Sequence, residues 1–345
     1  MNRAKPFRVA INGYGRIGQC VLRALYENGY RDHLQVVAIN ELSDIDTIAH
    51  LTRYDSTHGR FQGEVAVDGD NLVVNGDAIR VLRHPEPSEL PWRLLDVDLV
   101  LECSGAFTDR ATAQQHIDAG ATRLLFSQPA EPDVDRTVVY GVNHQQLNAD
   151  DVIVSSGSCT TNCLVPVIQV LDEAFGVEQG STTTIHASMN DHPVIDAYHH
   201  HDLPRPRSAL HNIVPVDTGL ARGIERLLPE MKGKFSSVAM RVPTLNVSAI
   251  DMVVNVRENT DVASVNRLLQ QAAQGALKGI LGYTDELLAS SDFYHDAHPG
   301  VVDGCPIRVT GGTMVEVLCW FADEWGFPNR MQGVTGVCLQ KSESF

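Results

Sequence analysis

The sequence predicts an α/β protein that combines a doubly wound parallel sheet with a second, α+β domain whose sheet is mainly antiparallel. Short apolar segments alternate with segments of helical periodicity through the first half of the chain, which is typical of a mostly parallel sheet. Strand-like segments dominate the second half, which favours antiparallel pairing. The 345 residues suggest two domains, at about 150 residues per domain.

The composition argues against several classes of protein. A hydrophobic content of 43% and a charged content of 20% are typical of a soluble globular protein. The net charge of -16 argues against nucleic acid or an anionic membrane as the main partner. No apolar run reaches the roughly 18 residues of a membrane span, and the first residues lack the apolar stretch of a signal peptide. The seven cysteines include no CxxC pair, which favours a reducing cytoplasm over a disulfide framework or a zinc site.

A glycine-rich turn follows the first predicted strand, over residues 7–12. Gly13, Gly15 and Gly18 form a GxGxxG pattern between this strand and a helix, which permits a tight turn and close approach of a pyrophosphate. A second strand ends at Glu41, about 20 residues further on, where dinucleotide-binding folds place an acid on the ribose 2′-OH. A carboxylate there would repel the 2′-phosphate of NADP, so NAD is the expected cofactor. The alternative is that Glu41 is merely an exposed carboxylate at a strand end.

Further alternation of strands and helices extends this first domain. Turn residues at 68–70 and 75–77 divide the alternating segment 63–81 into a small antiparallel meander. Buried strands are expected over 97–103 and 124–126, the second followed by Ser127, with helices over 44–54 and 111–119. Ligands of such sheets bind beyond the carboxyl ends of the strands.

Cys159 follows a strand-like run and a turn of small residues. Apolar residues spaced for one helical face come after it, and Gly176 is placed to end that helix. We therefore expect Cys159 at a helix N-terminus, where unpaired N–H groups and the positive dipole end lower a thiol pKa from about 8.5 and produce a nucleophile. A small buried cysteine is the alternative, and Pro166 is awkward inside a helix.

His186, at the end of another predicted strand, is the candidate base for Cys159. An imidazole can hold a thiolate as an ion pair or take a proton from a reaction intermediate, although spacing alone does not single out one of 14 histidines. The consecutive histidines at 199–201 point in different directions, so we expect no metal site there. Arg205, Arg207 and Arg241 could bind phosphate through their guanidinium groups, with surface ion pairs as the alternative.

Four motifs resemble those of the glyceraldehyde-3-phosphate dehydrogenase family, and the resemblance covers nearly the whole chain. They lie at residues 11–18, at 158–163 (Ser-Cys-Thr-Thr-Asn-Cys), at 241–244 (Arg-Val-Pro-Thr) and at 324–326 (Glu-Trp-Gly). The cysteine motif is highly specific. Segments 39–42, 191–199 and 292–296 look most like the erythrose-4-phosphate dehydrogenase branch of this family.

The resemblance implies a Rossmann NAD-binding domain over residues 1–157, completed by a C-terminal helix over 325–345, and a catalytic domain over 158–324. It makes Cys159 the nucleophile and His186 its base. The residues that would bind NAD are Asn12, Gly13, Gly15, Arg16, Ile17, Gly18, Glu41, Ser127 and Asp323. Those that would bind the substrate and phosphate are Ser158, Thr160, Arg205, Thr218, Gly219 and Arg241. The family assembles as homotetramers.

Four positions depart from the family pattern. Met189 stands where the glyceraldehyde enzymes carry a threonine that contacts the substrate phosphate, and a thioether donates no hydrogen bond. Asp323 replaces an asparagine that binds the nicotinamide carboxamide through both a donor and an acceptor, whereas a carboxylate only accepts. Ser156 and Gly157 replace an Asn-Ala pair. We expect a more loosely oriented cofactor and a lower turnover.

The expected function is NAD-dependent oxidation of D-erythrose 4-phosphate to 4-phosphoerythronate through a thioester on Cys159, a step toward pyridoxine biosynthesis by family association. One alternative is a phosphorylating glyceraldehyde-3-phosphate dehydrogenase, in which inorganic phosphate instead of water cleaves the thioester. Another is a weakly catalytic NAD-binding paralogue, which Asp323 favours and the intact Cys159 and His186 oppose. We expect a cytoplasmic homotetramer that acts on a phosphorylated small aldose, without metal, nucleic acid or membrane.

Overall fold

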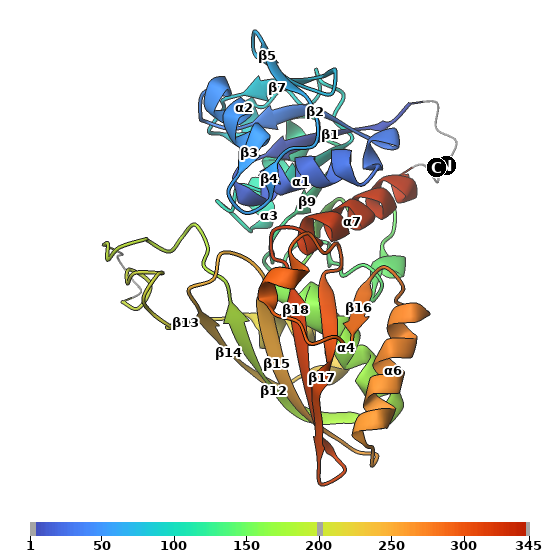
Figure 1. Cartoon of the computed structure of the whole chain (residues 1–345). Helices are drawn as coiled ribbons and strands as arrows, with labels where there is room; N and C mark the ends of the chain where they lie inside the picture. The colour runs from blue at the N-terminus through green and yellow to red at the C-terminus, as the bar shows by residue number, and fades with distance from the viewer. Residues whose placement is uncertain (1–4, 199–202, 343–345) are drawn as a thin grey trace. The chain divides into compact units, whose positions relative to one another are not determined.

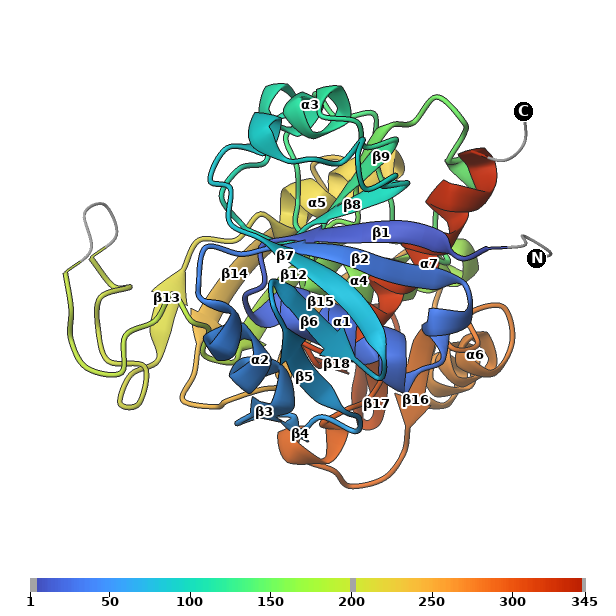
Figure 2. The same cartoon turned by 90° about the horizontal axis from the view of Figure 1, so that it is seen from above.

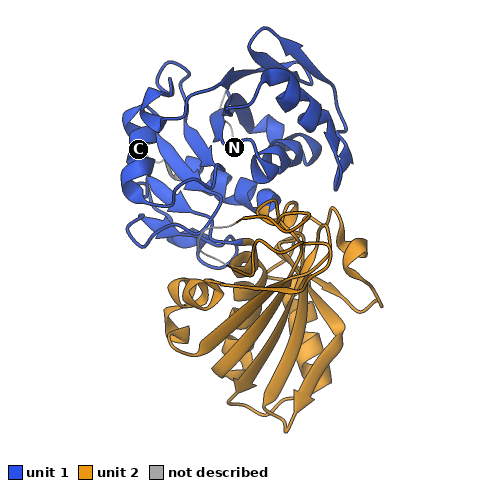
Figure 3. Cartoon of the chain, turned by 90° about the vertical axis from the view of Figure 1, so that its left-hand side faces the viewer, with its two compact units in different colours: residues 1–158, 328–345 blue, residues 159–327 orange. Residues whose placement is uncertain are grey.

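The structure is a computed structural model that describes residues 5–198 and 203–342. The histidine run at 199–201 lies outside the described residues. The chain divides into two compact units, which Figure 3 shows in different colours. Unit 1 comprises residues 1–158 and 328–345, and unit 2 comprises residues 159–327.

Unit 1 is built on a sheet of nine strands, counted over the described residues, in the order β10-β11-β9-β8-β1-β2-β7-β6-β5. Figure 1 labels β1, β2, β5, β7 and β9 of this sheet. The neighbours from β10 to β7 run parallel, and β5 and β6 add an antiparallel edge. The sheet strands are β1 (Phe7–Asn12), β2 (Leu34–Asn40), β5 (Val65–Asp68), β6 (Asn71–Val74), β7 (Asp77–Leu82), β8 (Leu99–Glu102), β9 (Arg123–Phe126), β10 (Arg136–Thr137) and β11 (Ile153–Ser155). The predicted meander over 63–81 is confirmed.

Helices and one short ribbon complete unit 1. The α-helices are α1 (Arg16–Glu27), α2 (Ile45–Arg53), α3 (Arg110–Asp118) and α7 (Gly326–Ser342), and the ribbon pairs β3 (Tyr54–Asp55) with β4 (Gly59–Arg60). Single 3₁₀ turns are η1 (Tyr30–Asp32), η2 (Pro87–Glu89) and η3 (His144–Gln146). Helix α3 packs against β9 and β11, and its Ala113 joins Trp92, Leu124 and Phe126 in a buried core.

The order of the strands reverses next to β1, which pairs in parallel with β2 on one side and with β8 on the other (Figure 2). Such a topological switch point opens a crevice at the carboxyl ends of the strands, where doubly wound folds bind their ligands. The glycine-rich turn leaves β1 at this end. The fold therefore directs the turn toward the expected cofactor site.

Unit 2 is built on a seven-stranded sheet, within its described part, in the order β13-β14-β12-β15-β18-β17-β16. The β12–β14 and β16–β17 pairs are parallel and the other pairs antiparallel, which confirms the predicted mainly antiparallel sheet. The strands are β12 (Val177–His186), β13 (Val214–Val216), β14 (Phe235–Arg241), β15 (Ser248–Val256), β16 (Leu281–Thr284), β17 (Gly300–Thr310) and β18 (Met314–Phe321). The helices are α4 (Cys159–Phe175), α5 (Leu220–Leu227) and α6 (Val262–Gln274), with 3₁₀ turns η4 (Pro229–Met231) and η5 (Ser290–Phe293).

Helix α4 is the central helix of unit 2. It packs against β12, β15, β17 and β18 (Figure 1), while α5 and α6 both pack against α4. The helix passes through Pro166 without interruption and ends before Gly176, which has a φ of +70°. The predicted start and end of this helix are thus confirmed.

Alternation along β12 decides which of its side chains are buried. Thr182, Thr184 and His186 are buried, whereas Ile185 between them is 38% exposed, as the two-residue period of a strand requires. His186 therefore shares the buried side of β12 with two threonines, at the carboxyl end of the strand. Across the described residues, every helix is too short or too polar to cross a lipid bilayer.

Candidate active site

The turn between β1 and α1 in unit 1 is shaped by its glycines. Gly13 has a φ of +85°, and a Cβ there would lie 2.4 Å from Ser104 Cα in the turn after β8. A Cβ on Gly18 would meet the carbonyl oxygen of Gly13 at 2.3 Å. No described atom lies within 4 Å of the Cβ position of Gly15, the N-cap residue of α1. Space for a pyrophosphate is therefore open at this helix N-terminus, where backbone N–H groups favour an anion.

Glu41 lies directly after β2, beside the same turn. Its Oε2 accepts the N–H of Tyr14 at 2.9 Å, and its Oε1 accepts the N–H of Ser43 at 3.3 Å. Each carboxylate oxygen has a further acceptor position, so Glu41 can also accept hydrogen bonds from ribose hydroxyls. The open cradle at Gly15 and this carboxylate together fit NAD.

Arg16 and Ile17 begin α1, and the guanidinium of Arg16 is engaged with Asp55. Arg16 Nη2 donates to Asp55 Oδ1 at 3.2 Å, and Nη1 pairs with Oδ2. Burial opposes the ionisation of Asp55, but hydrogen bonds from Arg16 and from the N–H groups of His58 and Thr57 outweigh it and lower the pKa of Asp55 to about 2. The guanidinium is thus held by a partner that is ionised at neutral pH.

Asn12 and Ser127 lie at the ends of β1 and β9, next to the turn. Asn12 Nδ2 donates to Glu102 Oε2 at 2.6 Å, and Asn40 Nδ2 donates to Asn12 Oδ1 at 2.7 Å. The Asn12 side chain is buried and joins the carboxyl ends of three neighbouring strands. The N–H of Ser127 donates to the carbonyl of Glu102 at 3.0 Å, and its side chain is half-buried.

In unit 2, the carboxyl ends of β12, β14 and β18 lie at one edge of the sheet. β14 runs parallel to β12, and β15 runs antiparallel to both β12 and β18, so these three strands end on the same side. His186 ends β12, Arg241 ends β14 in register with it, and Asp323 follows β18 by two residues. Strand pairing thus gathers an imidazole, a guanidinium and a carboxylate from distant parts of the sequence.

Cys159, the first residue of α4, joins this edge. Its Sγ, a ring nitrogen of His186 and a carboxylate oxygen of Asp323 all lie within 4.8 Å of one another. His186 Nε2 is 3.4 Å from Asp323 Oδ1, and the imidazole meets the ring of Phe321 edge to face with centroids 5.9 Å apart. The thiol and the imidazole therefore have the proximity that a nucleophile and its base require.

Backbone and hydroxyl groups fix the imidazole and the carboxylate. His186 Nδ1 lies 2.9 Å from the carbonyl oxygen of Ala187, and Arg241 Nη1 contacts the same ring nitrogen and donates to the same carbonyl at 3.3 Å. The Ser248 hydroxyl accepts the N–H of Ala187 at 3.0 Å and donates to Asp323 Oδ2 at 2.7 Å. Sequence reasoning missed Ser248, because a serine at the start of a strand carries no motif.

The expected lowering of the Cys159 pKa is wrong for this structure. Burial raises the pKa of the Cys159 thiol well above its usual value, the neighbouring Asp323 carboxylate raises it further, and Arg241 opposes the shift. The expectation rested on the helix N-terminus alone, whereas the carboxylate belongs to Asp323, near the other end of the sequence of unit 2. The thiol must therefore lose its proton to a base as it reacts, and His186 lies beside it.

Three other predicted anion-site residues lie at the starts of α4 and α5. Thr160 follows Cys159, the Thr218 hydroxyl accepts the N–H of Leu220 at 3.2 Å, and Gly219 is the N-cap residue of α5. The two helices touch near these ends, since a Cβ on Gly223 would lie 2.6 Å from the Thr161 methyl group.

The last two predicted residues are Ser158 and Arg205. Ser158 directly precedes Cys159 in the chain and ends the first segment of unit 1. Arg205 lies in the loop after β12, where its Nη1 is 3.9 Å from Asp191 Oδ2, and Met189 of the same loop is 43% exposed. The loop therefore contains both a predicted phosphate ligand and the residue that departs from the family pattern.

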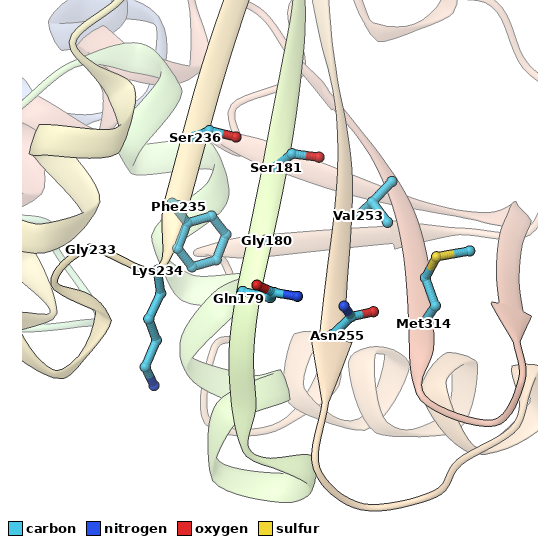
Figure 4. Close-up of a pocket in the computed structure, with 10 residues that line it drawn as sticks. All are labelled: Gln179, Gly180, Ser181, Gly233, Lys234, Phe235, Ser236, Val253, Asn255 and Met314. Atoms are coloured by element: carbon cyan, nitrogen blue, oxygen red, sulfur yellow. The ribbon is translucent and has the colours of Figure 1, made fainter.

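A separate pocket of about 380 Å³ lies at the opposite ends of the strands (Figure 4). It is lined by Gln179, Gly180, Ser181, Gly233, Lys234, Phe235, Ser236, Val253, Asn255 and Met314. Residues 179–181 begin β12, and Phe235 begins β14, whereas His186 and Arg241 end these strands. None of the predicted site residues lines this pocket.

A nucleotide-binding sheet in one unit and a thiol–imidazole pair in the other define an NAD-dependent oxidoreductase. Comparison with known families agrees. Residues 7–110 match the NAD binding domain of glyceraldehyde 3-phosphate dehydrogenase, and residues 158–323 match the C-terminal domain of the same enzyme. The chain belongs to the glyceraldehyde-3-phosphate dehydrogenase family.

Proposed function

We propose that this protein oxidises D-erythrose 4-phosphate to 4-phosphoerythronate with NAD, through a thioester on Cys159. The observation that carries the chemistry is the convergence of the Cys159 thiol and the His186 imidazole inside a domain of this family. A nucleophilic thiol beside a base suits the oxidation of an aldehyde by covalent catalysis.

The residues of unit 2 supply the proton transfers. His186 takes the thiol proton as Cys159 Sγ attacks the aldehyde carbon, and the carbonyl oxygen then receives a proton to give a hemithioacetal. When bound, NAD accepts the hydride from this carbon. His186 removes the hydroxyl proton as the hydride leaves, so that a thioester forms. Water then hydrolyses the thioester, which releases the acid and restores the thiol.

The preference for erythrose 4-phosphate rests on Met189 and on the branch-specific segments 39–42, 191–199 and 292–296. Met189 cannot donate the hydrogen bond that a threonine gives to the substrate phosphate in the glyceraldehyde enzymes. A weaker or differently shaped phosphate site favours a different aldehyde. Glyceraldehyde 3-phosphate with inorganic phosphate is the second candidate, supported by the family itself.

A paired assay tests the proposal. Initial rates of NADH formation are measured with erythrose 4-phosphate and with glyceraldehyde 3-phosphate, each with and without inorganic phosphate. We expect a higher kcat/KM for erythrose 4-phosphate and a rate that needs no phosphate. Strict dependence on phosphate with a preference for the shorter aldehyde would favour the second candidate, and no turnover of either would favour a weakly catalytic paralogue.

We also infer that the protein is a cytoplasmic homotetramer, as the family resemblance suggests. In the described chain, the seven cysteines are all free thiols, which suits a reducing compartment. Sedimentation velocity would show a single species of four chains. A monomer or dimer at working concentrations would contradict the inferred assembly.

A further inference from the structure

Asp323 presents a buried carboxylate oxygen that lacks a hydrogen-bond donor. Its Oδ2 accepts the Ser248 hydroxyl at 2.7 Å, whereas Oδ1 is buried and accepts no hydrogen bond from the described residues. A buried charge without a partner is costly, so such groups are normally paired, protonated or bound to a metal. The buried oxygen Oδ1 is therefore a candidate ligand for a cation.

The groups that face Oδ1 are themselves metal ligands. His186 Nε2 is 3.4 Å away, and Cys159 Sγ lies within 4.8 Å of both residues' ligand atoms. His186 Nδ1 contacts two groups that favour opposite tautomers: the Ala187 oxygen, at 2.9 Å, can only accept, whereas Arg241 Nη1 can only donate. In the tautomer that carries its proton on Nδ1, the lone pair lies on Nε2 and faces Asp323 Oδ1, and this is the form of His186 that binds a cation.

We propose that a thiophilic divalent cation of the Zn²⁺ type binds between Cys159 Sγ, His186 Nε2 and Asp323 Oδ1 and reversibly masks the nucleophile. Sulfur, imidazole nitrogen and carboxylate oxygen are the donors that Zn²⁺ prefers, at about 2.0 to 2.3 Å, and three protein ligands leave a fourth position for water. Binding releases the thiol proton to solvent. The thiolate and the carboxylate together neutralise the charge of the cation.

Neighbouring groups hold two of these ligands in the orientation that a metal requires. Ligating histidines usually donate their other N–H to a carbonyl or carboxylate, as His186 can to the Ala187 carbonyl 2.9 Å from Nδ1. Ligating carboxylates are hydrogen-bonded in turn, as Asp323 is by Ser248. Arg241 opposes binding through its positive charge on the Nδ1 side of the ring. An asparagine at position 323 would supply no negative charge, so the site depends on the residue that departs from the family pattern.

Cobalt spectroscopy tests the site directly. The full-length Cys305→Ser protein is titrated with Co²⁺, because Cys305 is an exposed thiol and is best removed. We expect tetrahedral visible bands and a sulfur-to-cobalt charge-transfer band, which Zn²⁺ displaces. Asp323→Asn should weaken binding at least about tenfold and Ser248→Ala by about tenfold, while Asp251→Asn on β15 should leave the affinity unchanged.

Loss of the charge-transfer band in Cys159→Ser is also required. A band that persists in this variant, or Co²⁺ affinity in Asp323→Asn equal to that of the parent, would overturn the proposal. If Asp323→Asn does not fold, protection is decisive: Zn²⁺ must slow iodoacetamide labelling of Cys159 in the parent, and a chelator must restore it. The spectra need no substrate, so they remain informative even if the proposed aldehyde is wrong; only the expected inhibition rests on the proposed function.

Discussion

Asp323 places a carboxylate beside a thiol that has to become a nucleophile. Burial and this carboxylate both raise the pKa of Cys159, and only Arg241 opposes them among the nearby side chains that affect it. Burial is common to any cysteine at this position, so the carboxylate is the part that a single substitution can remove. The thiolate population at neutral pH thus depends on residue 323.

Replacement of Asp323 by Asn should lower the pKa of Cys159. Removal of one adjacent negative charge stabilises the thiolate, and we expect the pH profile of iodoacetamide labelling to move down by about one unit. Labelling of Cys159 is followed by mass spectrometry, with a chelator present to exclude metal. Faster turnover of the aldehyde at neutral pH should accompany the shift. An unchanged labelling profile, with Asp251→Asn as the matched control, would show that the carboxylate has no such effect.

His116 of α3 is a second buried titratable group. Its Nδ1 accepts the Trp92 N–H at 3.0 Å, and its Nε2 lies 3.6 Å from Glu102 Oε2. Burial lowers the pKa of His116 to about 4 from a usual 6.5. Since the unfolded chain takes up the proton first, stability should be fully present above about pH 6.5 and decline as the pH falls to about 4.

His116→Gln should remove this decline while keeping an acceptor for Trp92. The difference in the free energy of unfolding between pH 7 and pH 4 should shrink by up to about 3 kcal/mol, measured by urea unfolding. Glu102, whose pKa burial raises, is present in both proteins and largely cancels in the comparison. The variant His33→Gln, at an exposed position, should behave like the parent. If the free energy of unfolding falls equally between pH 7 and pH 4 in His116→Gln and in the parent, the decline does not come from His116.

At single positions, the sequence predicted the site residues that lie in a motif or at a strand end, but it did not predict the residues and effects that depend on distant parts of the chain folding together. Cys159 and His186 are brought together as expected, because a specific motif and a strand end marked them. Ser248 and the raised thiol pKa could not be predicted, since both depend on the start of β15 and the end of β18 lying beside Cys159. Local sequence around Cys159 contains no information about a carboxylate far along the chain.

Among the elements, the turn between β1 and α1 contains two glycines with different roles, one in the protein's own packing and one in ligand binding. Gly13 needs a positive φ and close contact with Ser104, whereas Gly15 has an ordinary φ and open space around it. The first glycine is required by the protein itself. The second is required only if a ligand approaches the backbone.

Gly13→Ala and Gly15→Ala should therefore have different effects. Gly13→Ala should lower the melting temperature of the free protein, because the Cβ would lie 2.4 Å from Ser104 Cα. Gly15→Ala should retain the melting temperature but weaken NAD binding at least about tenfold, since the methyl group would occupy the pyrophosphate cradle. Differential scanning fluorimetry and NAD titration measure the two effects. Unchanged NAD affinity in Gly15→Ala would exclude the proposed cradle.

Prediction of the elements succeeded where turn residues or helix boundaries were explicit. The meander over 63–81 has Gly at both turns, and α4 ends at Phe175, directly before Gly176, as predicted. The sequence analysis did not identify β18, although Val315, Val317, Cys319 and Phe321 alternate with more exposed residues along it. Its partner β17 directly precedes it in a hairpin, whereas its other partner, β15, lies far earlier in the chain, so only the pairing with β15 is non-local.

For the whole molecule, unit 1 is made from both ends of the chain. Helix α7 buries Met331, Val334, Cys338 and Leu339, and Gln332 Nε2 donates to the Val21 carbonyl in α1 at 3.2 Å. The final helix is thus part of the core around the nucleotide-binding sheet, although every glycine of the cradle lies near the N-terminus.

Deletion of residues 328–345 should therefore abolish NAD binding, although the remaining chain still contains every residue that is predicted to bind NAD. Burial of the α7 side chains would be lost, and each large apolar one contributes about 2–5 kcal/mol. NAD titration and circular dichroism measure the effect. Met331→Ala, a single truncation of a fully buried side chain, should lower the stability of unit 1 without abolishing binding. A deletion variant that binds NAD normally would contradict this account.

The order of synthesis gives this arrangement a further consequence. A ribosome delivers the whole of residues 159–327 before it makes the segment that closes unit 1. The nascent polypeptide therefore passes through a stage in which the seven-stranded sheet can already fold while the dinucleotide module is still open at its core. A premature stop codon just before the codon of residue 328 would release a chain that retains the Cys159 thiol but has an incomplete coenzyme-binding unit.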